Sequence, residues 1–214
     1  MAFLMRAPHH CGSWSWDLDE AMPAGFDSAL TAATKIIGIL NRFELFSPVT
    51  LEYKWHIPKS GPTGVGTCLI IADSLDESSL LERVRGSRPT AFPDAEVGIL
   101  HFTGSGAWSD AKGNLRREAR LIDLSVSPSP FSLVAELSVH HDIWSWFDFS
   151  GHPHPEVYSR NAPRLADALR EVTSTLGVKP EVGEPTYFGH AVGYGISTPD
   201  ADRNGLGLDV TDHL

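Results

Sequence analysis

The sequence contains no apolar run approaching the ~20 residues that a membrane-spanning helix needs, and its apolar start at residues 1–5 is far too short for the core of a signal peptide. We therefore expect a cytoplasmic protein with no membrane segment. Cysteine is also scarce, with only Cys11 and Cys68. Their spacing matches no metal or redox motif, so we expect two reduced thiols.

Basic residues are in the minority, with 17 Lys and Arg against 27 Asp and Glu and a formal net charge of -10. Such a surface repels the phosphates of nucleic acids, so we expect no DNA or RNA partner. It would suit a basic protein partner. Many bacterial cytoplasmic proteins are acidic simply for solubility, and this simpler explanation stays beside that of a basic partner.

The usual catalytic motifs are missing. The sequence has no Gly-x-Ser-x-Gly elbow, no HExxH motif and no dinucleotide-binding fingerprint. The stretch GPTGVGT at 61–67 resembles the start of a phosphate-binding loop, but Cys68 stands where the motif needs its lysine. We therefore lean against an enzyme and expect no cofactor.

Hydrophobic periodicity predicts the secondary structure. The centre of the chain, residues 116–149, is rich in β-branched and aromatic residues, and strands are predicted at 119–126, 131–139 and 143–149. Prolines at 128 and 130 should end the first of these, because proline lacks the N–H that a strand ladder needs. Further strands are predicted at 49–57, 67–72, 96–103 and 184–196, and helices at 29–42, 77–85 and 163–176.

Short connections between strands favour antiparallel neighbours. We therefore predict an α+β fold, with a mainly antiparallel sheet and two principal helices packed on it. Residues 1–214 should form a single domain, with an irregular N-terminal arm at 1–25 and an acidic tail at 197–214 that contributes little to stability. A helix followed by a strand is predicted twice, at 29–42 and 49–57 and again at 163–176 and 186–196, which suggests a pseudo-repeat.

The strand predicted at 143–149 carries large apolar groups on both faces, with Trp144 and Trp146 on the same one. Such a strand is either central and covered on both sides or exposes one face to a partner. In the second case Trp144 and Trp146 are interface residues. The same face would also serve a self-associating structural protein.

Histidine and aspartate gather around the same predicted strand. The candidates for acid–base chemistry or zinc binding are His140, His141, Asp142, Asp148, His152 and His154. A strand between the two groups would place residues 140–142 and 152–154 ~20 Å apart, which argues against one shared site unless the loop folds back. A hydrolytic enzyme that uses this cluster is the alternative to a binding protein.

The acidic tail contains the first half of a calcium loop. Asp200, Asp202 and Asn204 alternate before Gly205, as in the pattern D-x-D-x-N-G. The twelfth position of that loop is Thr211, where a bidentate glutamate belongs. The alternatives are a loose calcium site and an ordinary Asn-Gly turn.

The last third of the chain carries a resemblance to a known family. Where the helix at 161–177 runs into the stretch GEPTYFG at 183–189, the sequence is similar to small actinobacterial immunity-type proteins. These proteins accompany polymorphic toxins and bind them. The resemblance implies a compact acidic α+β protein, without catalytic activity, that neutralises a basic toxin domain by covering its active site.

Overall fold

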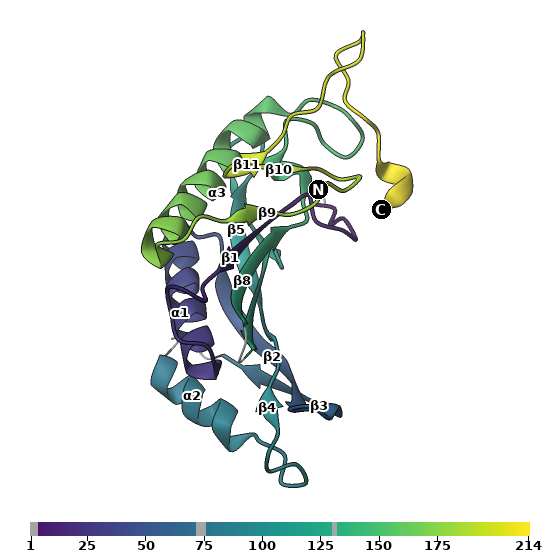
Figure 1. Cartoon of the computed structure of the whole chain (residues 1–214). Helices are drawn as coiled ribbons and strands as arrows, with labels where there is room; N and C mark the ends of the chain where they lie inside the picture. Colours follow the sequence, from purple (N-terminus) through teal and green to yellow (C-terminus); the bar gives the residue numbers. More distant parts are fainter. Residues whose placement is uncertain (1–3, 72–75, 130–131) are drawn as a thin grey trace.

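The computed structural model describes residues 4–71, 76–129 and 132–214. The fold is α+β, built on a nine-stranded antiparallel sheet with three α-helices (Figure 1). The strands of the sheet are β1 (Gly12–Asp17), β2 (Ser47–Ile57), β3 (Gly61–Ile70), β4 (Glu96–Val97), β5 (Leu100–Ser109), β6 (Leu115–Ala119), β7 (Ile122–Ser129), β8 (Ser132–Val139) and β9 (Glu181–Val182). Their order is β3-β2-β5-β7-β8-β1-β9, with β4 on β2 and β6 on β5.

The helices are α1 (Phe26–Arg42), α2 (Glu77–Gly86) and α3 (Pro155–Leu176). The remaining elements are the 3₁₀ turns η1 (Asp142–Trp144) and η2 (Thr211–His213) and a small hairpin of β10 (Ala191–Val192) and β11 (Gly195–Ile196). All three α-helices lie along one side of the sheet (Figure 1). We call the opposite side, which carries no α-helix in the described part of the chain, the open face.

Alternation along the strands decides which side chains meet the helices. On β7, Ile122, Leu124 and Val126 are buried, whereas Asp123 and Ser125 between them are only partly buried. α1 packs on β7 and β8, and α3 packs beside α1. The two principal helices bury apolar stripes that follow the helical repeat, as their sequences predict. The core therefore lies between one face of the sheet and the helices.

The prediction that residues 1–25 form an irregular arm is wrong for residues 12–17. They form β1, which pairs with β8 along its whole length, from Gly12 with Val139 to Asp17 with Val134. Trp14 and Trp16 are fully buried, and the indole N–H of Trp14 donates to the Gly193 carbonyl at 2.7 Å. Alternation of Trp with Ser gives this segment one core face and one polar face, as a strand in a one-sided sheet requires.

The strand predicted at 143–149 is wrong. β8 already has β7 on one edge and β1 on the other, so no edge is free for another strand. The chain instead makes η1 and a loop that returns to α3. The loop is closed by the bridge between Phe147 and Pro153 and by the bond from the His154 N–H to the Trp146 carbonyl at 3.0 Å.

Proline does not end β7 where expected. Pro128 lies within the strand, opposite Leu133 of β8, and the ladder continues to Ser129 and Ser132. Pro130 and Phe131 fall outside the described residues. The strand predicted at 67–72 starts earlier than expected, because β3 begins at Gly61, which already pairs with Ile57.

Two further expectations fail near the C-terminus. α3 begins at Pro155 rather than near 161 and continues through Pro163, while the buried Asn161 ties this turn to β5 by hydrogen bonds to the Ser109 backbone at 2.8 and 2.9 Å. The strand expected at 186–196 is reduced to β10 and β11, so the second half of the pseudo-repeat is not formed.

The acidic tail is docked rather than loose. The Val210 N–H donates to the Phe149 carbonyl at 2.8 Å, and the Gly207 N–H donates to the Gly151 carbonyl at the same distance. The side chain of Val210 is 5% exposed. The tail therefore covers the loop at 147–151, contrary to the expectation that it adds little to the fold.

Candidate functional site

A row of side chains crosses the open face in register, one from each of seven strands. In the order of the strands they are Cys68, Glu52, His101, Ser125, Glu136, Ser15 and Glu181. Directly opposed residues in antiparallel strands point to the same face of the sheet. We call this set the cross-strand row, and at about 4.8 Å per strand it spans roughly 29 Å.

The cross-strand row has an acidic character. Its three carboxylates, Glu52, Glu136 and Glu181, are exposed and form no salt bridge within the described part of the chain. None of the other members is a large apolar side chain. A polar surface of this kind remains solvated by itself and presents unpaired negative charge.

Next to the row, Asp123 binds two arginines, Arg6 and Arg120. It accepts from Arg6 and forms a salt bridge with Arg120 at 2.9 Å. The hydrogen bond with Asp123 raises the pKa of Arg120. Arg120 and Asp123 border a hollow of about 210 Å³ that His101 and Glu136 also line. Arg6 and Arg120 are thus engaged by Asp123, whereas exposed Lys54, two residues from Glu52 on the same face of β2, is the cation beside the row that no salt bridge in the described chain holds.

His140, one of the sequence candidates, lies at the margin of this site. Its Nδ1 is 3.2 Å from the Ala7 carbonyl oxygen, and its Nε2 is 3.6 Å from the Asp123 carboxylate. Burial lowers the pKa of His140, and Arg6 lowers it further, while Asp123 acts in the opposite direction. The imidazole is therefore mainly neutral at pH 7 and serves to hold the N-terminal segment at Ala7.

His141 is part of the core. It is 1% exposed, and its Nδ1 has no hydrogen-bond partner among the described residues. Burial, followed by the charge of Arg6, lowers the pKa of His141 to about 4. Such a group is a neutral, inaccessible histidine rather than a surface acid or base.

The remaining candidates of the cluster come together because the loop folds back. Burial raises the pKa of Asp142, and both His154 and Asp148 act on it electrostatically. The expected ~20 Å separation is therefore wrong, since it assumed a strand between them. His154 Nε2 lies 2.8 Å from the Ser145 carbonyl oxygen, and Asp148 accepts the His152 N–H at 2.8 Å. These contacts hold the loop, and in the described ranges no three His, Cys, Asp or Glu side chains are placed to hold a metal.

A second hollow, of about 250 Å³, lies between this loop and the docked tail. It brings Asp148 near His190, but its walls are chiefly Phe147, Phe149 and Phe188. Phe149 and Phe188 pack edge to face, with ring centroids 5.6 Å apart. The hollow is thus an aromatic seam between two segments of the fold, with polar groups at its rim.

Trp144 and Trp146 do not share a face. Trp144 is 0% exposed and belongs to the core, so it is not a surface available to a partner in this structure. Trp146 is 36% exposed and packs edge to face on Tyr158 of α3, with centroids 5.6 Å apart. Of the two proposed interface residues, only Trp146 is accessible.

The tail residues proposed for calcium form a turn. The Asp202 carboxylate accepts the backbone N–H groups of Asn204 at 2.8 Å and Leu206 at 2.9 Å. The Leu206 and Asn204 N–H groups lower the pKa of Asp202. Its oxygens therefore close an Asx-type turn at Gly205, and Asp200 is not drawn into that network in the described structure.

The cross-strand row was not identified from the sequence. Its signal is the alternation that leaves Glu52, His101 and Glu136 on the polar side of three separate strands. That pattern predicts a polar face for each strand but not which residues stand opposite each other. Register depends on the pairing of the whole sheet.

Searches of protein-family models, of curated proteins and of solved structures found no match to this chain. Among the described helices, none is long and apolar enough to cross a membrane. The functional interpretation therefore depends on the geometry of the open face.

Proposed function

We propose that the chain is a non-catalytic protein-binding protein of the immunity type, and that it docks a basic partner on the open face of its sheet. The observation that carries this proposal is the cross-strand row. Glu52, Glu136 and Glu181 stand in one registered line, exposed and without salt bridges in the described structure. A complementary surface would supply lysine or arginine to each.

The dimensions of the row support this interpretation. A protein interface of standard size buries about 800 Å² on each partner, which corresponds to a round patch roughly 32 Å across. The row spans roughly 29 Å by the strand spacing. A single globular partner could therefore contact all three carboxylates at once.

Electrostatics should act chiefly on the rate of encounter. The net charge of -10 and the unpaired row attract a basic partner over distance. At physiological salt the attraction is screened beyond ~8 Å. Added salt should therefore slow association much more than it speeds dissociation.

The test uses two triple variants that change the charge by the same amount. The row variant carries Glu52→Gln, Glu136→Gln and Glu181→Gln. The control carries Glu82→Gln, Glu156→Gln and Asp167→Asn, which are exposed positions of α2 and α3 on the other side of the sheet. Each protein is used to capture partners from host lysate, and captured proteins are identified by mass spectrometry.

The expected result is a basic protein that wild type and the control capture and the row variant loses. The isolated partner should then be toxic when expressed alone, and co-expression of wild type should restore growth. Capture that survives in the row variant, or a partner whose association rate does not depend on salt, would contradict docking on this face. A captured partner without toxicity would retain the binding role and remove the immunity interpretation.

A further inference from the structure

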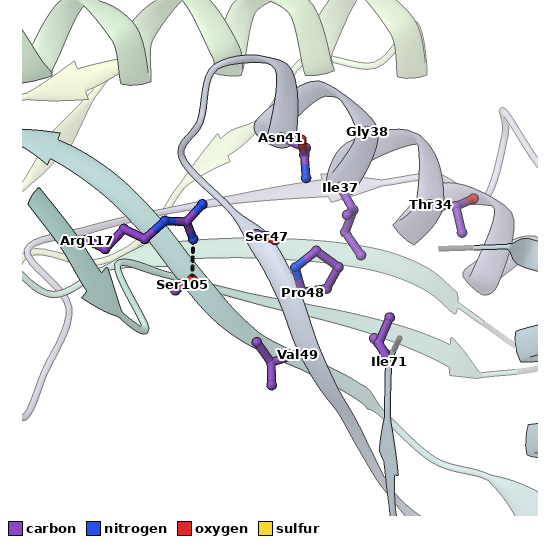
Figure 2. Close-up of a pocket in the computed structure, with 10 residues that line it drawn as sticks. All are labelled: Thr34, Ile37, Gly38, Asn41, Ser47, Pro48, Val49, Ile71, Ser105 and Arg117. Atoms are coloured by element: carbon purple, nitrogen blue, oxygen red, sulfur yellow. Dashed lines mark hydrogen bonds between the residues drawn. The ribbon is translucent and has the colours of Figure 1, made fainter. Parts of the chain in front are cut away.

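A cavity of about 610 Å³ lies between α1 and the uncovered end of β2, away from the cross-strand row. Figure 2 shows its lining residues, with α1 on one side and the strands on the other. The cavity exists because β3 pairs with β2 only from Thr50 onward, and the register of β2 against β5 shifts between Pro48 and Thr50. Pro48 thus occupies a strand edge, where its missing N–H costs no ladder bond with β3.

The cavity has a mixed lining, with apolar residues beside several polar side chains and one cationic end. Ile37 and Ile71 are almost fully buried beneath it, at 2% and 8% exposed, so Pro48 and the 49% exposed Val49 supply its accessible apolar surface. Arg117 of β6 reaches in at one end, and its guanidinium donates to the Ser105 hydroxyl at 3.0 Å. Thr34 marks the opposite end of the view in Figure 2.

Arg117 differs from the arginines beside it. Arg116 forms a salt bridge with Asp110 at 3.0 Å, and Arg120 forms one with Asp123 at 2.9 Å. Within residues 4–71, 76–129 and 132–214, Arg117 has only the neutral hydroxyl of Ser105. In a protein of net charge -10, a guanidinium that faces a cavity without a carboxylate is available to an anionic ligand.

Two more polar groups near this end lack side-chain partners. Neither the Asn41 amide nor the Ser47 hydroxyl forms a side-chain hydrogen bond in the described part of the chain. In Figure 2 the Asn41 side chain extends from α1 toward the cavity, and the guanidinium of Arg117 is turned toward the side where Ser47 and Ser105 lie. The guanidinium N–H groups of Arg117 are therefore accompanied by the Asn41 amide and the Ser47 hydroxyl as further hydrogen-bond donors.

Gly38 is an exposed residue of α1 that lines the cavity. It lies in the middle of α1, where glycine costs roughly 0.5–1 kcal/mol relative to alanine. A Cβ built there would meet no atom within 4 Å, so packing does not require glycine. By contrast, a Cβ at Gly104 would lie 2.2 Å from the Ser47 carbonyl oxygen, and glycine is obligatory there. What the missing side chain of Gly38 does provide is room in the cavity wall.

We infer that this cavity binds a small organic monocarboxylate, with its carboxylate on Arg117 and its apolar body along Pro48 and Val49. The volume is in the range typical of small-molecule sites, about 300–1,000 Å³. One unpaired guanidinium in a strongly acidic protein favours a monoanion over a doubly charged phosphate. The inference does not depend on the proposed function, because the row variant leaves every lining residue of the cavity unchanged.

The test titrates the full chain with hexanoate and phenylacetate, followed by calorimetry or NMR. Hexanol and hexylammonium are the uncharged and cationic counterparts, and hexyl phosphate is the doubly charged one. Wild type should bind the two carboxylates at millimolar concentration or below and bind the counterparts at least ~10-fold more weakly, a difference of about 1.4 kcal/mol.

Four variants locate the site. Arg117→Gln should weaken carboxylate binding at least ~10-fold, whereas Arg116→Gln, on the neighbouring residue with its own carboxylate partner, should leave it unchanged. Gly38→Leu should abolish binding by filling the cavity, with a melting temperature equal to or above wild type because leucine is the better helix former. Gly38→Ala, with a smaller group in the same open space, confirms that the helix tolerates a side chain there.

The proposal is overturned if neither carboxylate binds wild type at millimolar concentration, if Arg117→Gln binds as well as Arg116→Gln, or if Gly38→Leu is folded and still binds. Preference for hexyl phosphate would overturn the carboxylate assignment. None of these results involves the open face, so failure here and failure of the protein-binding proposal can be told apart.

Discussion

The Oδ2 atom of Asp142 accepts a hydrogen bond from the backbone N–H of Phe149 at 3.1 Å. This contact joins the two ends of the segment that follows β8 and converts it into a closed loop. Burial raises the pKa of Asp142, and the Phe149 N–H acts in the opposite direction. The loop determines where Trp144, Trp146 and the C-terminal tail lie.

Replacement of Asp142 tests the closure of the loop. Asp142→Ala leaves the Phe149 N–H without an acceptor and should lower the free energy of unfolding by about 1–3 kcal/mol. Asp142→Asn keeps an acceptor oxygen of similar shape and should stay close to wild type. Urea denaturation of both variants measures the difference. Equal loss in both would show that the charge, rather than the hydrogen bond, matters.

The two tryptophans should respond differently to truncation. Trp144→Ala removes a fully buried indole and should cost about 3–5 kcal/mol, because the core cannot close the cavity. Trp146→Ala removes a partly exposed ring and one edge-to-face contact, so its cost should be near 1 kcal/mol. Chemical unfolding gives both values, and Trp144→Phe serves as a milder control. A Trp144→Ala protein as stable as wild type would contradict the core assignment.

Stability should fall in mild acid because of His141. Its pKa is about 4 when folded and near 6.5 when unfolded, so the unfolded chain binds the extra proton between these values. The free energy of unfolding should therefore decrease as the pH drops from 6.5 toward 4. At about 1.4 kcal/mol per pH unit, the full difference corresponds to on the order of 3 kcal/mol.

Asp142 contributes with the opposite sign. Its raised folded pKa means that the folded state holds a proton more readily than the unfolded state, so stability from this group increases as the pH falls toward 3.8. The free energy of unfolding should therefore fall more steeply with decreasing pH in Asp142→Asn, because the destabilising effect of His141 is then no longer opposed by Asp142. Denaturation curves at several pH values between 4 and 7 test this. A shallower slope in Asp142→Asn would reject the assignment of the two signs.

Removal of the tail should destabilise the fold. Truncation after Thr198 exposes the aromatic seam of Phe149 and Phe188 and removes the buried Val210, which together should cost about 1–3 kcal/mol. Val210→Ala should reproduce part of the loss, whereas Leu208→Ala, at a side chain that is 68% exposed, should have little effect. Thermal melting compares the three proteins. Unchanged melting after truncation would mean that the tail contacts contribute no net stability.

Local patterns in the sequence determined the α+β class, the apolar stripes of α1 and α3, and the strands near 49–57 and 131–139. Each of these depends on the spacing of apolar residues along one segment, which is a property that the segment carries by itself. The histidines and aspartates at 140–154 were also visible as a group, and the Asp202 turn follows from the Asn-Gly pair. The local rule that proline ends a strand failed at Pro128, because pairing with Leu133 of the neighbouring strand keeps β7 intact there.

The tertiary structure decided the remainder, because it depends on which segments become neighbours. Residues 12–17 and 143–149 both carry alternating tryptophans, and β1 took the edge of β8 that the second segment would have needed. Residues 143–149 therefore form a loop, in which Trp144 lies in the core and Trp146 at the surface. The register of seven strands then placed Glu52, Glu136 and Glu181 in one line, and the early end of β3 opened the cavity at Arg117. Both features join residues far apart in the chain, whose proximity is set by packing rather than by any local pattern.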